Sequence, residues 1–413
     1  MFDVIDEGAI YIINGLNKNN YEAYLVGGCV RDMILQKKPE DFDVATSASP
    51  DEVKSIFKKT IDTGIQHGTV TVRVNNKSYE VTTYRIDGEY KDNRRPSNVK
   101  FTCSLENDLA RRDFTMNAIA YHPQIGFVDP FDGQGDINRK IIKAVGEPGQ
   151  RFNEDALRIL RAVRFSVQLG FDISPPTIKS AIENAHLIKN LSTERIRDEF
   201  FKTIQGRYFD KFKLFAEFAP YIDVGLAGYI KENMDNIVKY APLCGGGLTG
   251  LLAMFFYNYP PDKTESLLKA LKASSSLARS ARLVLEAFHT PALGYTIRKA
   301  AGIAGYEHFE ITVGMHMSIA EAEGGPYMAY AEKLSRGYDS VKLNGPPITL
   351  KDLDINGGDL HGVAEGKLMG WVLKYLMGMV LKYPFYNKKS LLMALAKRYV
   401  EKAGPNAHCS NFI

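Results

Sequence analysis

The spacing of apolar and polar residues changes from short, alternating runs to a helical period near residue 150 of the 413-residue chain. Before that point, the runs "YEAYLVGG" and "FDVAT" predict two short strands, and "VRDMILQ" between them predicts a helix. The segment "GTVTVRVNNKSYEVTTYRI" alternates on both sides of Asn75 and Asn76, which is typical of a β-hairpin. Ser49, Pro50 and Glu52 form the capping-box pattern of a further helix start.

From residue 151 onward the apolar positions recur every three or four residues. The segment "RFNEDALRILRAVRFSVQLG" predicts one helix, with four apolar residues on one face: Leu157, Leu160, Val163 and Val167. Gly170 is expected to end this helix, and Ser192 is expected to cap a later one. We expect no strand after residue 150. The pattern therefore predicts an α+β fold, with a small mixed β-sheet head followed by an all-helical rear.

Composition fits a globular protein, with 45% apolar and 24% charged residues. No stretch approaches 18 uncharged apolar residues and the N-terminus has no basic region, so neither a membrane span nor a signal peptide is expected. The four cysteines are scattered, which argues against a zinc cluster or a disulfide framework and favours the reducing cytoplasm. Residues 1–145 carry a net charge of −2 and the remainder +6, which fits a metal-dependent head and a polyanion-binding rear.

Two short motifs in the head carry candidate phosphate-transfer chemistry. In "LVGGCVRD", Gly27 and Gly28 let backbone N–H groups approach phosphates at a helix start, and Arg31 adds a bidentate phosphate donor. In "DFDVAT", Asp41 and Asp43 stand one residue apart, so they share a strand face and can hold a pair of divalent metal ions. Alone, either motif is commonly a turn or a solvated strand end. Their order and spacing together favour metal-assisted transfer of a nucleotidyl group.

Five motifs, in order, resemble those shared by the class II tRNA nucleotidyltransferases, the CCA-adding enzymes and bacterial poly(A) polymerases of the polymerase β superfamily. They are "LVGGCVRD…EDFDVATSASPDEV", "RRDFTMNAIAY", "DPFDGQGDINRKIIKAVG", "RFNEDALRILRAVRF" and "LSTERIRDEFFKTI". The resemblance covers the first 205 residues, and "DLDINGGDLHG" with the sequence after it is similar to the family's tail more loosely. It implies four domains: a catalytic head (1–146), a helical neck for base recognition (147–206), a helical body (207–290) and a helical tail for tRNA binding (291–413).

The resemblance implies that Asp41 and Asp43 bind two Mg²⁺ ions. It places a third carboxylate, Glu80, on a neighbouring strand, as base or metal orienter for the RNA 3′-hydroxyl. An acid on the solvent face of a hairpin explains Glu80 nearly as well.

In "RRDFTMNA", the resemblance implies that Arg111 and Arg112 reach the triphosphate, while Asp113 and Asn117 hydrogen-bond the ribose. Asp113 would accept from the 2′-hydroxyl and so favour ribonucleotides.

The motif "EDALR" offers a protein template for base choice. Glu154, Asp155 and Arg158 are expected near one helix face, and a surface ion pair is the ordinary interpretation of that spacing. Cytosine and adenine each present an amine donor beside a ring-nitrogen acceptor, whereas uracil and guanine present the reverse. Asp155 can only accept and Arg158 can only donate, so the pair complements C and A. Glu154 would hold the Arg158 guanidinium in place, and Arg161 is assigned to the same base-recognition set.

The polar segment after the hairpin is expected to be a mobile loop. In the resembling family this segment is needed for the switch from adding C to adding A. Here it has full length, with Asp87, Glu89, Arg94 and Arg95 present, which argues against an enzyme that adds only CC.

The expected partners are tRNA, CTP and ATP, with neither DNA nor a membrane, and the sequence sets no oligomeric state. Candidate RNA contacts are Arg298, Lys299, Lys388 and Lys389, although exposed lysines commonly serve solubility. The leading hypothesis is template-independent addition of C, C and A to the tRNA 3′ end. An A-only or poly(A)-adding relative, a non-catalytic tRNA-binding protein and a small-molecule nucleotidyltransferase stay open as alternatives.

Overall fold

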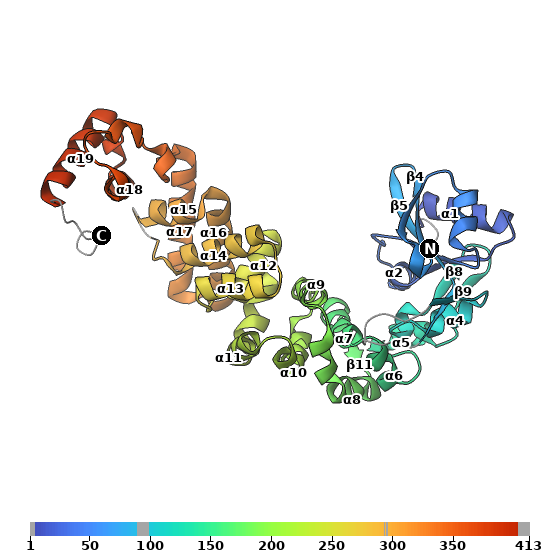
Figure 1. Ribbon diagram of the computed structural model, residues 1–413. Coiled ribbons are helices and arrows are strands. Elements are labelled where there is room, and N and C mark those ends of the chain that lie inside the picture. The colour runs from blue at the N-terminus through green and yellow to red at the C-terminus, as the bar shows by residue number, and fades with distance from the viewer. Residues whose placement is uncertain (1–4, 89–98, 293, 295, 404–413) are drawn as a thin grey trace. The chain divides into compact units, whose positions relative to one another are not determined.

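The computed structural model describes residues 5–88, 99–292, 294 and 296–403. Figure 1 shows the helices and strands along the chain. The chain divides into two compact units, Met1–Lys231 and Glu232–Ile413, each with hydrophobic clusters of its own.

A seven-stranded mixed sheet forms the head, in the order β3-β4-β5-β2-β1-β8-β9. The strands are β1 (Ala23–Val26), β2 (Asp43–Thr46), β3 (Thr60–Gly64), β4 (Thr69–Val74), β5 (Lys77–Thr83), β8 (Ala120–His122) and β9 (Gly126–Val128). Strands β2 and β5 run parallel, and the other neighbours run antiparallel. The predicted hairpin is confirmed as β4–β5. Asn75 and Asn76 have φ of 48° and 64°, the positive values that a two-residue type I′ turn requires.

Two short strand pairs lie outside this sheet. Strands β6 (Arg85–Asp87) and β7 (Val99–Phe101) pair antiparallel on either side of the segment expected to be a loop. Strands β10 (Ile141–Ile142) and β11 (Asp172–Ile173) pair in parallel. The expectation of no strand after residue 150 is therefore wrong at β11. Two residues are too few to show a β period in the sequence, and here β10 supplies the pairing.

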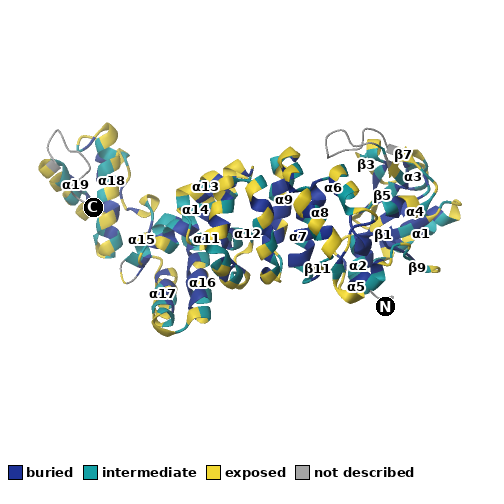
Figure 2. Ribbon diagram, turned by 90° about the horizontal axis from the view of Figure 1, so that it is seen from below, coloured by how far each residue is buried: buried dark blue, intermediate teal, exposed yellow. Residues whose placement is uncertain are grey.

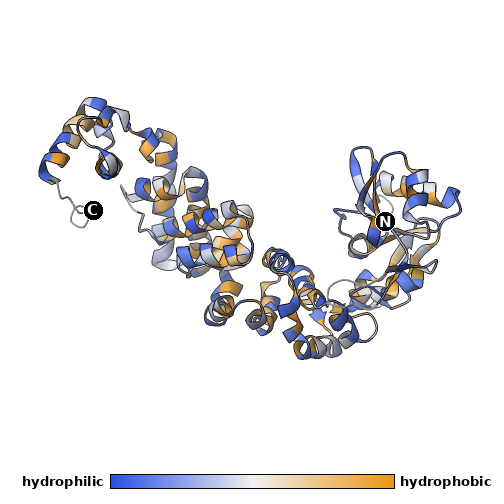
Figure 3. Cartoon of the chain, viewed as in Figure 1, coloured by the Kyte–Doolittle hydropathy of each residue, from blue (hydrophilic) through white to orange (hydrophobic). Residues whose placement is uncertain are grey.

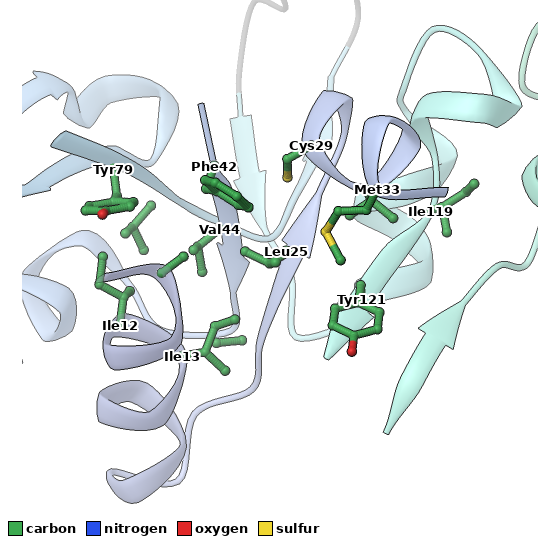
Figure 4. Close-up of a cluster of buried hydrophobic side chains, with 14 of the residues drawn as sticks. Ile12, Ile13, Leu25, Cys29, Met33, Phe42, Val44, Tyr79, Ile119 and Tyr121 are labelled. Carbon is green, nitrogen blue, oxygen red and sulfur yellow. The ribbon is translucent and has the colours of Figure 1, made fainter. Parts of the chain in front are cut away.

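Helices cover the head sheet and bury its apolar side chains. They are α1 (Glu7–Lys18), α2 (Gly28–Ile34), α3 (Pro50–Ile56), α4 (Leu105–Ala110) and α5 (Gly133–Arg139). The predicted capping box of α3 is confirmed. Figure 4 shows Ile12 and Ile13 of α1 beside Leu25, Val44 and Tyr79 of the sheet, all within one buried cluster. This packing fixes the ends of β1 and β2, from which the site residues project.

The helical part of the first unit contains α6 (Pro148–Glu154), α7 (Leu157–Leu169), α8 (Pro175–Glu183), α9 (Thr193–Ile204) and α10 (Phe215–Phe218). Gly170, with φ 74°, ends α7 as predicted. Ser192 occupies the predicted N-cap position of α9, but its side chain makes no capping hydrogen bond. The single helix expected from residue 151 to Gly170 is wrong, because Asp155 adopts extended geometry (φ −145°, ψ 101°) and separates α6 from α7. Its side chain accepts the Leu157 N–H, a local bond that competes with helix continuation.

The described residues that follow are mainly helical, and the boundary between the two units falls within the first of these helices. The helices are α11 (Val224–Tyr240), α12 (Gly247–Phe255), α13 (Pro261–Ala270), α14 (Ser275–His289), α15 (Thr296–Ala304), α16 (Tyr306–Glu323), α17 (Gly325–Asn344), α18 (Gly366–Lys382) and α19 (Lys389–Ala403). Figure 2 shows buried and exposed residues alternating along these helices, and Figure 3 shows hydrophobic and hydrophilic residues interspersed. Among the described residues, no helix has the length and hydropathy to cross a membrane. The α+β class with a helical rear is confirmed.

Candidate active site

A cavity of about 460 Å³ lies in the first unit, between residues of the head and residues of α7 and α9. Its lining consists of Gly27, Gly28, Arg31, Asp43, Arg111, Arg112, Asp113, Asn117, Asp155, Leu157, Arg158, Arg161, Arg164, Phe165 and Arg195. Seven arginines thus face three aspartates, and this excess of guanidinium groups suits a polyanionic ligand such as a triphosphate.

The cavity brings together most of the site residues predicted from the sequence. Asp41, Glu80 and Glu154 are not among its lining residues, although each of them interacts with one that is. Sequence reasoning missed four lining residues: Leu157, Arg164, Phe165 and Arg195. Arg195 stands inside the motif "LSTERIRDEFFKTI", which offered a signal, but nothing in the spacing connected it with Asp155, 40 residues earlier.

The glycine turn lies at the start of α2, where Gly27 has φ 77°. A Cβ at Gly27 would lie 3.1 Å from Nη1 of Arg112 and 4.0 Å from Oδ2 of Asp43, so any side chain would crowd the groups that face the cavity. Arg31, one turn into α2, donates to Oδ1 of Asn117 at 3.0 Å. The turn therefore leaves space for a ligand close to the backbone.

The carboxylates of Asp41, Asp43 and Glu80 lie on two neighbouring strands and just before one of them, with Asp41 two residues ahead of β2 and Glu80 in the middle of β5. Asp43 begins β2 and is the register partner of Glu80 on the parallel strand β5. Water reaches all three side chains. Even so, the protein atoms around Asp43 and the negative charges of Glu80 and Asp41, partly offset by Arg112, raise the pKa of Asp43 to about 6. A divalent cation would relieve this mutual repulsion, so the donor set fits a metal ion.

This carboxylate group has the donors of an open metal site. Within the described part of the chain, no three His, Cys, Asp or Glu side chains converge into a ready-made cage. Mg²⁺ is commonly held by one or two carboxylates together with substrate phosphates, so Asp41 and Asp43 meet that requirement without a third protein ligand.

Asp108 of α4 orients the two arginines of "RRD", a role that the sequence did not suggest. It is fully buried, and its Oδ1 and Oδ2 accept from Arg111 at 2.7 Å and from Arg112 at 3.1 Å. Burial alone would raise the pKa of Asp108, but the attraction of Arg111 and Arg112 outweighs it and holds the pKa below its usual value. Both guanidinium groups therefore enter the cavity already fixed in orientation.

A second buried network centres on Asp113. Its Oδ1 accepts from Nδ2 of Asn117 at 3.0 Å, and its Oδ2 accepts from Nε of Arg161 at 2.8 Å. Burial opposes the charge of Asp113, yet Arg161, Asn117 and Arg158 overcome it and lower the pKa of this carboxyl to about 2. The structure thus pairs Arg161 with Asp113, from the set expected to bind ribose.

Arg158 is 8% exposed and has several protein partners. Its Nη1 donates to Oε2 of Glu154 at 2.8 Å and to the Arg151 carbonyl at 3.2 Å, and its Nη2 donates to the Arg111 carbonyl at 2.9 Å. The pairing of Glu154 with Arg158 is thus as the spacing predicts. Asp155 departs from that spacing, because the break after α6 turns it toward Nη2 of Arg195, 2.7 Å away.

Phe165 of α7 forms an apolar surface within this charged cavity. The guanidinium carbons of Arg31, Arg161 and Arg164 lie 5.1, 5.3 and 4.2 Å from its ring centroid. Burial lowers the pKa of Arg164 to about 10, although Glu199, whose Oε2 lies 2.7 Å from Nε of Arg164, works against this shift. Three guanidinium groups of the cavity thus lie within cation–π distance of one ring.

None of the remaining predicted residues that the structure describes is part of the cavity lining. Asp87 ends β6, while Glu89, Arg94 and Arg95 fall outside the described residues. Arg298 donates to the Leu381 and Lys382 carbonyls at 2.6 and 3.1 Å, so it caps the end of α18. Lys389 is paired with Asp359 at 2.5 Å, and Lys299 and Lys388 are exposed.

Comparison with protein families gives three matches along the chain. Residues 23–143 match the family described as Poly A polymerase head domain. Residues 170–223 match the family described as "Probable RNA and SrmB- binding site of polymerase A", and residues 250–396 match tRNA nucleotidyltransferase domain 2.

Individual proteins match over most of the chain. It is 36% identical over 394 residues to the CCA-adding enzyme of Lactobacillus gasseri, which covers 93% of this chain and 95% of that one. It is 50% identical over 223 residues to the CCA-adding enzyme of Geobacillus thermodenitrificans, 54% of each chain. The solved structure of the Bacillus stearothermophilus CCA-adding enzyme in complex with CTP matches with a TM-score of 0.80 and 34% identity, over 95% of this chain and 97% of that one.

Proposed function

This chain belongs to the family of CCA-adding enzymes, as its motifs predict, and we propose that its cavity binds CTP and ATP in turn and transfers their nucleotidyl groups to the tRNA 3′ end. The reaction adds C, C and A without a nucleic-acid template and releases pyrophosphate at each step. One observation supports this proposal: the lining of a single cavity includes Asp43, which interacts with Asp41 and Glu80, together with arginines on buried carboxylates and the pair Asp155 and Arg158.

Nucleotidyltransferases of this family use a divalent metal, and we propose Mg²⁺ held by Asp41 and Asp43. Bound there, the metal would neutralise charge on the triphosphate and promote ionisation of the RNA 3′-hydroxyl. Glu80, beside Asp43 in register, would accept the hydroxyl proton or orient the ligands.

Arg111 and Arg112 would bind the phosphates that leave as pyrophosphate. Because Asp108 holds both guanidinium groups before substrate arrives, little side-chain freedom is lost on binding. Asp113 and Asn117 would receive the ribose hydroxyls, with Arg161 keeping Asp113 ionised as an acceptor.

Base choice would rest on Asp155 and Arg158. Of the five N–H donors of Arg158, three are used in the hydrogen bonds to Glu154 and to the Arg151 and Arg111 carbonyls found among the described residues. Two donors remain for a base acceptor. Asp155 supplies acceptor capacity for an exocyclic amine, so C and A fit while U and G place like groups against each other.

The exposed lysines of the second unit, Lys299 and Lys388, would contribute to holding the tRNA backbone by charge. Such contacts read the shape of the RNA and carry no base information.

The test is incorporation of labelled CTP and ATP, with Mg²⁺, into tRNA transcripts ending at the discriminator base, at C and at CC. Addition of CCA to the first transcript is expected. Addition of A to the CC transcript alone would identify an A-only enzyme. Failure on all three transcripts, with intact tRNA binding, would identify a non-catalytic tRNA-binding protein.

A further inference from the structure

Arg195 is the one guanidinium group of the cavity that α9 contributes. Its Nη2 donates to Oδ2 of Asp155 at 2.7 Å, and the other terminal nitrogen, Nη1, is buried without a hydrogen-bond partner in the described structure. Buried donors are rarely left unpaired. An unpaired donor on the wall of a ligand cavity indicates that bound ligand or water completes the site.

The backbone alone does not fix Asp155, since this residue lies in the break between α6 and α7. Two contacts from different elements hold its carboxylate instead: the Leu157 N–H bonds Oδ1 at 3.1 Å, and Arg195 bonds Oδ2. A carboxylate has about four acceptor positions, so these two bonds leave capacity for an amine of the base. They also fix the plane of the carboxylate.

The position of Arg195 is itself set by a second link between α9 and α7. Glu199, one turn further along α9, is 4% exposed and pairs with Arg164 of α7 at 2.7 Å. Ile196 and Phe200 of the same helix are buried. The two ion pairs, one turn apart, therefore fix α9 against the segment that carries Asp155 and Arg158.

We propose that Arg195 is a positioning residue for nucleotide selection: it orients Asp155 as an acceptor toward the exocyclic amine of cytosine or adenine. The inference rests on the proposed function of Asp155. Without Arg195, the Asp155 carboxylate can rotate away from the base, so the site loses its preference for an amine over a carbonyl oxygen.

The test compares Arg195→Ala with Arg197→Ala. Arg197 lies on the same helix, pairs with the adjacent Asp198 and is not part of the cavity lining. For each variant, kcat and KM are measured for CTP and UTP on the transcript ending at the discriminator base, and for ATP and GTP on the CC transcript. We expect Arg195→Ala to lower the C-over-U and A-over-G preferences by about 10- to 100-fold, the effect of one charged hydrogen bond. Arg197→Ala should keep the parent preferences.

A conservative variant and a double variant distinguish a positioning role of Arg195 from a general loss of structure. Arg195→Lys should restore part of the preference, because it keeps the charge and one donor. Adding Arg195→Ala to Asp155→Ala should cause little further loss of the C-over-U and A-over-G preferences, because Arg195 is proposed to act through Asp155. Should Arg195→Ala fail to fold, Arg195→Gln decides: a lowered preference supports the proposal and an unchanged one overturns it.

Equal loss of turnover with all four nucleotides, and no change in preference, would mean that Arg195 is merely structural and would overturn this inference alone. A parent enzyme that incorporates neither CTP nor ATP would overturn the proposed function and this inference with it.

Discussion

The cavity of the first unit and the helical second unit use charged residues in opposite ways. Around the cavity, the carboxylates that hold arginines have little solvent contact: Asp108 is 0% exposed and Asp113 is 8% exposed. In the second unit, a pair such as Lys342 and Glu310 keeps 54% and 61% of its side chains exposed. Breaking a buried pair costs about 3–5 kcal/mol, whereas an exposed pair contributes about 0–1 kcal/mol. The first unit thus fixes its charges for a ligand of defined shape.

The largest effect is expected at the carboxylates that face the metal. Asp43→Asn should lower single-turnover incorporation of CTP by more than about 10³-fold, because the loss of a metal-binding charge removes several kcal/mol of transition-state stabilisation. Asp51→Asn is the matched control, since the Asp51 side chain is 91% exposed and pairs with Lys54, and Asp51 is not part of the cavity lining. Comparable activity of the two variants would contradict the metal assignment.

Asp108→Ala and Glu310→Ala compare how much a buried and an exposed ion pair contribute to the free energy of unfolding. Removal of this carboxylate leaves Arg111 and Arg112 with their buried partner missing, so the free energy of unfolding should fall by about 3 kcal/mol. Urea denaturation followed by far-ultraviolet circular dichroism measures it. Glu310→Ala in the second unit should change the same quantity by less than about 1 kcal/mol. Equal losses for the two variants would remove the contrast between the units.

Asp155→Ala should relax base choice with less effect on stability. Its carboxylate is the acceptor proposed for the exocyclic amine, so the preference for CTP over UTP should fall by about 10²-fold. Steady-state kcat/KM for both nucleotides gives the measurement, with Asp198→Ala of α9 as the control. Selectivity like that of the parent would show that the base is chosen elsewhere.

The low pKa of Asp113 predicts that its contribution to the free energy of unfolding depends on pH only under acidic conditions. A carboxyl whose pKa falls from 3.8 in the unfolded chain to about 2 in the folded one stabilises the fold above the first value. This contribution to the free energy of unfolding, about 2 kcal/mol, is lost as the pH falls from 3.8, the pKa in the unfolded chain, to below about 2, the pKa in the folded chain. The free energy of unfolding of the parent should therefore decrease between about pH 5 and pH 2. Asp113→Asn should flatten that decrease, and an unchanged slope would exclude Asp113 as its source.

The sequence predicted the head better than it predicted the connections between its charges. Local signals sufficed for the β4–β5 turn at Asn75 and Asn76 and for the capping box of Ser49, because turn and cap chemistry acts over two to four residues. The motifs also placed eleven lining residues in one cavity. The contact between Asp155 and Arg195 spans 40 residues and depends on packing of α9 against α7, which no local pattern encodes.

The helix break at Asp155 is a local feature that the sequence pattern did not predict. The spacing of Glu154 and Arg158 is helical, and their ion pair forms across the break all the same. Apolar periodicity cannot detect a two-residue interruption, because the apolar face begins again at Leu157. In the second unit, the sequence marks Arg298 as a cationic surface residue, yet it caps α18 through carbonyls 83 and 84 residues away.

The smallest effects are expected on tRNA binding, where variants of Lys299 and Arg298 should behave differently. Lys299→Ala should weaken tRNA binding by only about 2- to 5-fold and reduce the slope of log affinity against log salt by about one, as expected for one phosphate contact. Arg298→Ala should leave that slope unchanged and lower the thermal unfolding midpoint, because it frees two helix-end carbonyls. Filter binding across a salt series gives both slopes. A salt slope that changes with Arg298 instead of Lys299 would mean that the capping contacts give way to RNA, and that the second unit, like the first, fixes a cation for its ligand.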